Sequence, residues 1–265
     1  MDTISVVVSG VLGKMGQQVL SAVTEASDTK PIGAVDKFAG DLDFIDLPDG
    51  SGKVPLSTSI DDVIDGANVV IDFSSPEGAI NAIKSGSSRG VNIVIGTTGI
   101  DEKIISEARS IASKANIGIV IAANFAMGAV LMMHLVEKSS KFFDYVDLTE
   151  AHHEAKIDSP SGTAIAIANS MIQGKPEGFD STISESETIK GARGAYHKGI
   201  NIHSARMPGK VAYHEAVFGA LGQTLKITHE SINRESFMPG VLMATRYVVN
   251  RPGLTLGLEE IMELQ

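Results

Sequence analysis

The stretch ISVVVSGVLGKMG, residues 4–16, decides the fold of the first half of the chain. Its first six residues are mostly β-branched and predict a strand that leads into a glycine-rich turn. Residues 13–26 then place Val19, Leu20 and Val23 on one face of a predicted helix. A strand, a glycine turn and a helix in this order are typical of the opening βαβ unit of a dinucleotide-binding domain.

The glycines of this turn have the spacing G-x-x-G-x-x-G at Gly10, Gly13 and Gly16. Glycine allows a backbone to approach a pyrophosphate closely, and the N-terminus of the following helix offers N–H groups to an anion. Asp36 ends a second predicted strand, residues 31–35, where a carboxylate can accept hydrogen bonds from ribose hydroxyls. The alternatives are a glycine turn with a purely structural role and a solvated acid at a strand end.

Further strands and helices alternate up to about residue 122. Short apolar strands separated by helices indicate a parallel sheet that is covered on both faces, so the predicted class is α/β with a Rossmann-type, doubly wound sheet. The predicted strands are residues 69–73, 91–95 and 117–122, and the predicted helices are residues 60–64, 76–86 and 101–115, with Asp101 as the cap of the last.

The second half has a different rhythm, because strands follow one another without helices between them. Consecutive strands indicate an antiparallel or mixed sheet and hence a C-terminal α+β domain. We expect domains at 1–124, completed by the tail 233–265, and at 125–232. The predicted elements are helices 127–139 and 163–172, strands 146–152, 200–206, 212–219 and 223–231, a loop region 174–201, and tail helices 237–249 and 258–264.

Composition excludes several classes of function. The chain has 265 residues and a formal net charge of −10, which argues against a general DNA or RNA binder. It has no cysteine, so disulfides, thiolate zinc sites and cysteine nucleophiles are excluded. We expect no signal peptide, because no basic n-region precedes the first strand. The most apolar stretch, residues 117–136, contains Asn124 and His134 and is interpreted as a strand, a loop and a helix. We expect a cytoplasmic protein without a membrane span.

Three loops of small and hydroxyl residues follow predicted strands, at residues 72–76, 96–99 and 122–125. The carboxyl ends of parallel strands meet at one edge of the sheet, where ligands of open α/β sheets gather. These loops suit a cofactor that runs along that edge, although each loop taken singly is an ordinary turn.

The stretch EAHHEAKIDSPSGTA, residues 150–164, carries the chemistry of the second domain. His152 and His153 are adjacent at a strand end, so they point to opposite faces and should have different roles. Lys156 follows, and a Pro-Ser-Gly-Thr turn opens a helix whose N–H groups and hydroxyls can hold an anion. This set suits proton transfer on a carboxylate substrate.

A metal site is the alternative for this stretch. It contains no H-E-x-x-H spacing and offers no evident third ligand, so we expect no metal. The remaining histidines are expected to be ordinary surface or hydrogen-bonded residues; they are His134, His197, His203, His214 and His229.

Taken together, these motifs resemble those of the dihydrodipicolinate reductase family of the diaminopimelate route to lysine. They occur in the family's order and span most of the chain. The matching motifs are G-x-x-G-x-M-G at residues 10–16, I-D-F-S-x-P-E-G at 71–78, V-I-G-T-T-G at 94–99, A-A-N-F at 122–125 and E-A-H-H-x-x-K-x-D-x-P-S-G-T-A at 150–164.

The resemblance implies a two-domain homotetramer in which the open sheet of the second domain serves assembly. It implies the reduction of 4-hydroxy-tetrahydrodipicolinate to tetrahydrodipicolinate with NADH or NADPH. His152 matches the family's general acid–base residue, and Lys156 matches its proton donor. By the same matching, the substrate-binding residues are Thr98, His153, Lys156, Ser161, Gly162 and Thr163.

The cofactor-binding residues combine the glycine turn and strand-end acid with the matched loops. Lys37, beside Asp36, can place a positive charge near a 2′-phosphate. The full set is Gly10, Val11, Leu12, Gly13, Lys14, Met15, Asp36, Lys37, Gly96, Thr97, Thr98, Ala122, Ala123, Asn124 and Phe125.

Two places in the sequence depart from the family pattern, one of a single residue and one of three residues. Val11 replaces the small residue that usually follows the first glycine. Tyr213, His214 and Glu215 stand where the family usually has Gly-Glu-His, so no role is transferred to them.

Two other readings are possible. One is another Rossmann-type NAD(P)-dependent oxidoreductase that acts on a small carboxylate, although the absence of cysteine excludes the thioester chemistry of semialdehyde dehydrogenases. The other is a dinucleotide-sensing module, which would need the glycine turn and Asp36 but not residues 150–164.

Overall fold

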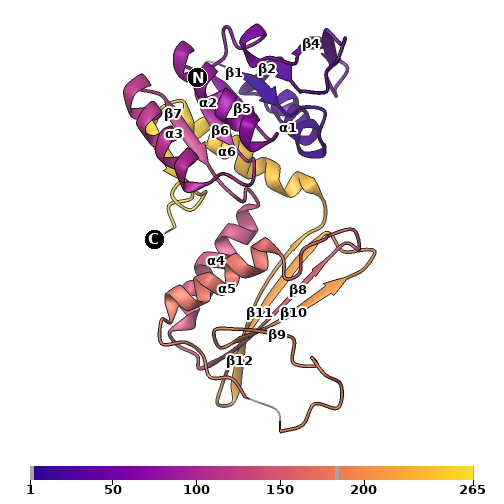
Figure 1. Ribbon diagram of the computed structural model, residues 1–265, viewed down its shortest axis with the longest axis vertical. Coiled ribbons are helices and arrows are strands. Elements are labelled where there is room, and N and C mark those ends of the chain that lie inside the picture. The colour runs from indigo at the N-terminus through magenta and orange to yellow at the C-terminus, as the bar shows by residue number, and fades with distance from the viewer. Residues whose placement is uncertain (1–2, 183–184, 265) are drawn as a thin grey trace. The chain divides into compact units, whose positions relative to one another are not determined.

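The computed structural model describes residues 3–182 and 185–264 (Figure 1). The chain divides into two compact units. Unit 1 consists of Met1–Met127 and Phe237–Gln265, and unit 2 is the intervening segment Gly128–Ser236. Unit 2 is therefore an insertion into the sequence of unit 1, and the chain crosses between the units twice.

Unit 1 contains an eight-stranded sheet in the order β13-β7-β6-β5-β1-β2-β4-β3. All neighbouring strands are parallel except β3 and β4, which form an antiparallel pair at one edge. This is the predicted doubly wound architecture. The strands are β1 Ile4–Ser9, β2 Thr29–Val35, β3 Phe44–Asp46, β4 Lys53–Ser57, β5 Val69–Asp72, β6 Asn92–Ile95, β7 Gly118–Ile121 and β13 Gly253–Leu256.

Four α-helices pack on this sheet in two pairs: α2 with α3, and α1 with α6. Two of them have side-chain caps. Ser75 Oγ accepts a hydrogen bond from Gly78 N at 3.2 Å, and Asp101 Oδ1 accepts one from Ile104 N at 2.8 Å, as predicted for Asp101. The helices are α1 Lys14–Glu25, α2 Pro76–Arg89, α3 Glu102–Ala115 and α6 Met238–Val248, with short 3₁₀ turns η1 Ile60–Asp62 and η2 Arg234–Phe237.

Both faces of this sheet are buried, as parallel strands require. Val7, Val70 and Ile93 lie side by side on adjacent strands and form one core with α2 and α3. Alternation along the strands directs Val6 and Ile71 to the opposite face, where α1 and α6 pack, and both are fully buried. Because helices pack on both faces of the sheet, the strand ends that carry the predicted loops have fixed positions along one edge of it.

Unit 2 contains a five-stranded mixed sheet in the order β12-β11-β8-β10-β9, in which β8 and β10 are parallel and the other neighbours are antiparallel. Helices α4 and α5 form a core with one face of this sheet, centred on Leu148, Ile202 and Phe218. The elements are α4 Met127–Ser140, β8 Tyr145–His152, α5 Gly162–Gly174, β9 Ala195–His197, β10 Ile200–Arg206, β11 Ala212–Ala220 and β12 Gln223–Ser231.

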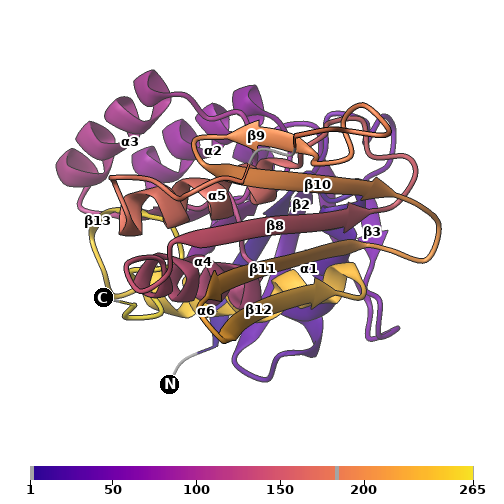
Figure 2. The same ribbon diagram turned by 90° about the horizontal axis from the view of Figure 1, so that it is seen from below.

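The other face of this sheet is open. Figure 2 looks directly onto the five strands, with α4 and α5 behind them. On that face, Tyr145 is 48% exposed, and Asp147 and Thr149 are partly exposed. A one-sided sheet of this kind is typical of antiparallel and mixed sheets.

Four sequence expectations were wrong or incomplete. The expected loop after Asp36 contains the edge pair β3 and β4, and the expected loop 174–201 contains the short strand β9, although residues 183–184 lie outside the described residues. Strand β13 extends the sheet beside β7 and was not expected. Residues 258–264 form turns rather than a helix. All are short segments, for which periodicity carries little information.

Within the described parts of the chain, none of the helices combines the length and the apolar character needed to cross a membrane.

Candidate active site

The glycine turn of unit 1 lies between β1 and α1 and is held by backbone hydrogen bonds. Gly10 N and Val11 N both donate to Val35 O, at 2.8 and 3.2 Å. Gly10 has φ +80°, which favours glycine, and a Cβ at Gly16 would collide with the Gly10 carbonyl. Gly13, which precedes the first turn of α1, offers no side-chain cap. The N–H groups at the start of α1 are therefore available to an anion.

Asp36 joins the end of β2 to this turn. Its side chain is buried, Oδ2 accepts a hydrogen bond from Leu12 N at 2.9 Å, and Oδ1 accepts one from Phe38 N at 3.0 Å. Beside it lies a groove of about 860 Å³, here called the unit 1 groove. Its lining includes Gly10, Leu12, Gly13, Asp36, Lys37, Phe38, Ser59, Ser74, Ser75, Glu77 and Lys84.

The unit 1 groove has the features that a nicotinamide dinucleotide requires. A turn without side chains lies beside an uncapped helix N-terminus, and a carboxylate lies at the end of the next strand. Phe38, whose side chain is 75% exposed, adds an aromatic surface that the sequence analysis did not single out. The residues present therefore fit the cofactor.

Asp72 connects three strand ends at the same edge of the sheet and is fully buried. Its Oδ2 accepts hydrogen bonds from Ser9 Oγ and Ser74 Oγ, both at 2.6 Å, and its Oδ1 accepts one from Thr97 Oγ1 at 2.5 Å. Thr97 Oγ1 in turn accepts a hydrogen bond from Ser74 N at 2.8 Å. We call this set the hydroxyl hub; it fixes the predicted loops after β1, β5 and β6 relative to one another.

The other predicted cofactor residues of unit 1 differ in accessibility. Val11, Ala122 and Phe125 are buried, and the Phe125 ring packs 5.6 Å from that of Phe73. Asn124 Oδ1 accepts a hydrogen bond from Ala126 N at 2.9 Å and shapes its own loop. Thr98, Ala123 and Lys14 are exposed, whereas Met15 and Gly96 are partly buried.

In unit 2, His152 and Glu150 lie on the same face of β8, two residues apart. His152 Nδ1 is 2.5 Å from Glu150 Oε2, and Glu150 is fully buried. Arg206, on neighbouring β10, donates to both carboxylate oxygens of Glu150 at 2.9 Å each. Its Nη2 also donates to Asp158 O at 2.6 Å. Neither Glu150 nor Arg206 received a role in the sequence analysis.

These contacts shift two ionisation equilibria. Burial raises the pKa of Glu150, but hydrogen bonds from Arg206, Ser204 and His152 outweigh burial and hold it below its usual value. Burial lowers the pKa of His152, against an opposing effect of Glu150. Glu150 is therefore an anion near neutral pH, beside an imidazole whose neutral form is favoured.

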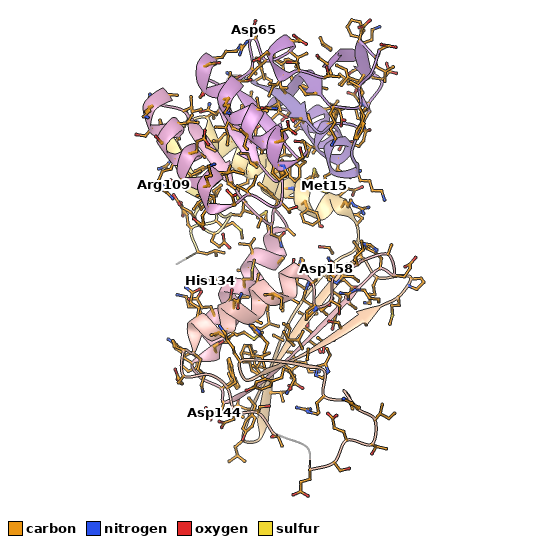
Figure 3. The ribbon with its side chains drawn as sticks, in the orientation of Figure 1. Met15, Asp65, Arg109, His134, Asp144 and Asp158 are labelled. Atoms are coloured by element: carbon orange, nitrogen blue, oxygen red, sulfur yellow. The ribbon has the colours of Figure 1, made fainter. Side chains whose placement is uncertain are left out.

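Lys156 lies in the turn that follows β8. Its Nζ is 2.7 Å from Asp158 Oδ1, and its side chain is 24% exposed. The ion pair lowers the pKa of Asp158, whose position in unit 2 is labelled in Figure 3. His153 follows the end of β8 and is partly exposed. The last residue of β8 and the turn after it therefore carry His152, His153 and Lys156.

The predicted Pro-Ser-Gly-Thr turn opens α5. Ser161 caps this helix, because its Oγ accepts a hydrogen bond from Ala164 N at 3.1 Å, and its N–H donates to Glu150 Oε1 at 3.3 Å. Its side chain is buried. Gly162 is exposed and Thr163 partly exposed at the first turn of the helix, where backbone N–H groups favour an anion.

The expectation that all remaining histidines are surface or hydrogen-bonded residues was incomplete for His214, which has a hydrogen-bond partner at one ring nitrogen only, and for His229. His214 is 2% exposed, and its ring lies edge-on to His152 with centroids 5.3 Å apart. Its Nε2 is 3.3 Å from Ser161 Oγ, whereas Nδ1 is buried without a partner, as is Nδ1 of His229. Burial lowers the pKa of His214 to about 4.

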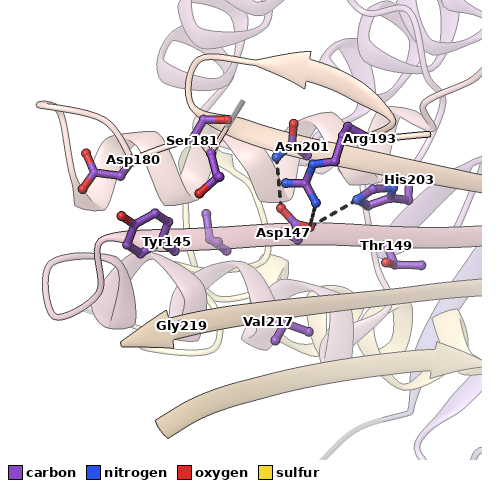
Figure 4. Close-up of a pocket in the computed structure, with 12 residues that line it drawn as sticks. Tyr145, Asp147, Thr149, Asp180, Ser181, Arg193, Asn201, His203, Val217 and Gly219 are labelled. Carbon is purple, nitrogen blue, oxygen red and sulfur yellow. Dashed lines mark hydrogen bonds and ion pairs between the residues drawn. The ribbon is translucent and has the colours of Figure 1, made fainter. Parts of the chain in front are cut away.

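A second hollow, of about 460 Å³, lies on the open face of the unit 2 sheet (Figure 4). At its centre, Asp147 accepts hydrogen bonds from Asn201 Nδ2 at 3.2 Å and from His203 Nε2 at 3.3 Å, and Arg193 Nη1 is 3.8 Å away. None of the predicted site residues lines it. In residues 3–182 and 185–264, no group of three or more acidic or histidine side chains is arranged to hold a metal ion.

Both halves of the chain match models of the same protein family. Residues 4–125 match the family model "Dihydrodipicolinate reductase, N-terminus", and residues 128–262 match "Dihydrodipicolinate reductase, C-terminus". The 4-hydroxy-tetrahydrodipicolinate reductase of Dehalococcoides mccartyi strain CBDB1 is 41% identical over the full length of both chains. That of Desulfitobacterium hafniense strain DCB-2 is 37% identical over 99% of this chain and 100% of its own.

Among solved structures, the dipicolinate-bound dihydrodipicolinate reductase of Paenisporosarcina sp. TG-14 superimposes with a TM-score of 0.87. It is 33% identical to this chain and covers 98% of it, with 99% of its own length aligned.

Proposed function

The chain belongs to the dihydrodipicolinate reductase family and catalyses the pyridine-nucleotide-dependent reduction of 4-hydroxy-tetrahydrodipicolinate in lysine biosynthesis; from this we propose that His152 and Lys156 form its proton-transfer site. The observation that carries the proposal is the buried contact between His152 and the Glu150 carboxylate, beside the Lys156 turn and the start of α5. A dinucleotide-sensing module would have no use for this arrangement.

We further propose that unit 1 binds the cofactor in the unit 1 groove. The glycine turn and the start of α1 would hold the pyrophosphate, and Asp36 the adenine ribose. The loops around Thr97 and Phe125 lie at the same sheet edge and would hold the nicotinamide half. When bound, the cofactor supplies a hydride to the substrate.

The reduction also consumes a proton and releases the substrate hydroxyl as water. His152 Nε2 is the atom that would exchange this proton, because Nδ1 already contacts Glu150. Lys156 would place a positive charge, and a donor N–H, beside the same substrate. Its ion pair with Asp158 keeps the ammonium group near the turn when the site is empty.

The dicarboxylate substrate would be gripped by groups around α5. In unit 2, Gly162 and Thr163 present first-turn backbone N–H groups, and His153 is an accessible side chain. In unit 1, the exposed Thr98 is the residue that we propose for the same substrate on the basis of the family motif. Ser161 would act by holding the turn, since its Oγ is already engaged with Ala164 N. The relative crystallised with dipicolinate carries a ligand of the same dicarboxylate type.

We propose that both NADH and NADPH are accepted. Asp36 suits the free ribose hydroxyls of NADH, and the exposed Lys37 and Lys84 both line the groove where a 2′-phosphate would add charge. A homotetramer that uses the open face of the unit 2 sheet is the proposed assembly, since this face carries the partly exposed side chain of Tyr145. The absence of cysteine fits a cytoplasmic location.

The test of the proton-transfer site is His152→Ala. Reduction would be followed as NADH oxidation, with substrate supplied by the enzyme that condenses pyruvate with aspartate semialdehyde. We expect kcat to fall by about 10²–10⁴-fold, the usual contribution of a positioned acid or base, with NADH affinity unchanged. His197→Ala, which changes a partly exposed histidine of β9, is the matched control. A His152→Ala enzyme with wild-type kcat, or inactivation by a chelator, would overturn the proposal.

A further inference from the structure

The Glu150 carboxylate, whose contact with His152 supports the proposed proton-transfer site, is fully buried and has several hydrogen-bond partners. Its Oε2 contacts His152 Nδ1 and Arg206 Nη1, and its Oε1 accepts from Arg206 Nη2 and Ser161 N. A carboxylate has about four acceptor positions, and all four are used. Such complete use means that Glu150 cannot reorient without breaking several contacts at once.

We propose that Glu150 is a positioning residue, which fixes the orientation of the His152 ring and its tautomer. Arg206 offsets part of the negative charge of Glu150 and so sets how strongly that charge acts on the ring. An ionised carboxylate can only accept hydrogen bonds, so the short contact requires the proton to be on His152 Nδ1. In the neutral ring Nε2 is then unprotonated, and it is the atom left for proton exchange. The inference deepens the proposed function and rests on it.

Arg206 extends this control beyond β8. Its two parallel hydrogen bonds to Glu150 are the rigid fork geometry in which arginine recognises a carboxylate. Its additional bond to Asp158 O ties the carboxylate to the turn that carries Lys156. The Arg206 guanidinium therefore links the orientation of His152 to the position of Lys156.

Charged and titratable groups face His152 from every strand and turn packed against it in unit 2. Glu150 is on its own strand, Arg206 on β10, His214 on β11, and Lys156 with Asp158 in the following turn. The pKa of His152 is lowered first by burial, is raised by Glu150, and is lowered further by Lys156 and Arg206. His214, with a pKa of about 4, is neutral above that pH and adds no charge.

The two charged partners therefore have opposite effects on His152, and this gives the proposal a signature. Glu150→Gln removes the negative charge, so the pKa of His152 should fall. Arg206→Met removes the positive charge while keeping an unbranched side chain, so the pKa should rise. Because a general acid must be protonated, the alkaline fall of kcat/KM should move to lower pH in Glu150→Gln and to higher pH in Arg206→Met.

The experiment combines pH profiles of kcat/KM with NMR titration of isotope-labelled His152 in the full-length enzyme. In Glu150→Gln, kcat should fall at least about tenfold while KM changes little, since Glu150 does not face the substrate. Asp144→Asn is the matched control. It breaks the Lys175–Asp144 ion pair, which lies at the other end of unit 2 from Asp158 (Figure 3), and should leave the profile unchanged.

The outcomes separate the inference from the proposed function. Loss of kcat in His152→Ala with an unshifted profile in both partner variants would overturn the inference alone, whereas wild-type kcat in His152→Ala would overturn the proposed function. Where Glu150→Gln does not fold, the wild-type enzyme decides through the ¹⁵N shifts of His152 above its pKa. We expect the Nδ1–H tautomer, and the Nε2–H tautomer would refute the role of Glu150.

Discussion

Asp72 in unit 1 and Glu150 in unit 2 are both fully buried carboxylates near the carboxyl end of a strand, but their partners differ in kind. Asp72 is surrounded by three neutral hydroxyls, whereas Glu150 lies between a guanidinium and an imidazole. The hydroxyl hub fixes three loops with donors that do not titrate near neutral pH. The partners of Glu150 include an imidazole, which is a group that titrates near neutral pH, so the charge of Glu150 can influence proton transfer.

The largest expected difference between the two carboxylates is in stability. Glu150→Ala leaves the mostly buried Arg206 without its carboxylate, and breaking such a pair costs about 3–5 kcal/mol. Asp72→Ala leaves hydroxyls that can rotate to other acceptors, so a loss of about 1–3 kcal/mol is expected. Denaturant unfolding of both variants at one protein concentration measures this. An Asp72→Ala loss equal to or above that of Glu150→Ala would contradict the comparison.

Acid should lower the free energy of unfolding through His214, which packs against His152 in unit 2. Its pKa is about 4 in the folded protein against an ordinary value of 6.5, so the unfolded state binds the proton first as the pH falls. The contribution of His214 to the free energy of unfolding should be constant above pH 6.5, should decline between pH 6.5 and 4, and should level off below pH 4. The total decline should be roughly 3 kcal/mol, at 1.36 kcal/mol for each unit of pKa difference.

His214→Asn should remove this part of the pH dependence, because the side chain no longer titrates. Urea unfolding of the wild type and the variant at pH 7.5, 5.5 and 4 provides the measurement. Parallel stability curves for the two proteins across this range would show that His214 does not take up the proton.

A substitution of Lys156 tests whether the charged residues near His152 also act on the substrate. Lys156→Ala removes both a positive charge and a proton donor, so kcat should fall and KM should rise, with kcat/KM reduced by about 10²-fold. Steady-state kinetics at saturating NADH separates the two constants. Asp158→Asn is the control for the ion pair itself and should have the smaller effect. A change in KM alone would reduce Lys156 to a binding residue.

The smallest expected effect concerns Lys37, which lines the unit 1 groove. Lys37→Ala should weaken NADPH binding by about two- to fivefold, the range of an exposed charge contact, and should change NADH binding less. Titration of both cofactors by fluorescence compares them directly, with Lys30→Ala at the other end of β2 as control. Equal losses for the two cofactors would show that Lys37 does not contact the 2′-phosphate.

The sequence predicted most of the elements of both sheets, because their strands are long or strictly bounded. Strands β1, β10 and β12 have the predicted bounds, and the consecutive strands of the second half form the predicted mixed sheet. Strand β4 and the edge strand β3 are short and follow glycine-rich segments, where no periodicity distinguishes them from a loop. Strand β13 is identified only by its pairing with β7, which a local pattern cannot reveal.

In unit 2, the candidate site was predictable only where its residues are close in sequence. Residues 150–164 carry His152, Lys156 and the α5 turn in one motif. Arg206 is 56 positions from Glu150, and it reaches the carboxylate because β10 pairs with β8 in parallel register. His214 reaches the same place through antiparallel pairing with β11. The pairing of strands, which the sequence leaves open, brought these unassigned side chains to the motif.

The insertion of unit 2 into unit 1 constrains the order in which the polypeptide matures during translation. Unit 2 is one continuous segment, so all of its strands emerge in succession from the ribosome. Unit 1 needs α6 and β13, which are synthesised last. At roughly 5–20 residues per second, the intervening segment takes roughly 5–20 s to synthesise. During that interval the edge of β7 that later pairs with β13 has no partner strand, and such an edge is open to pairing with other chains.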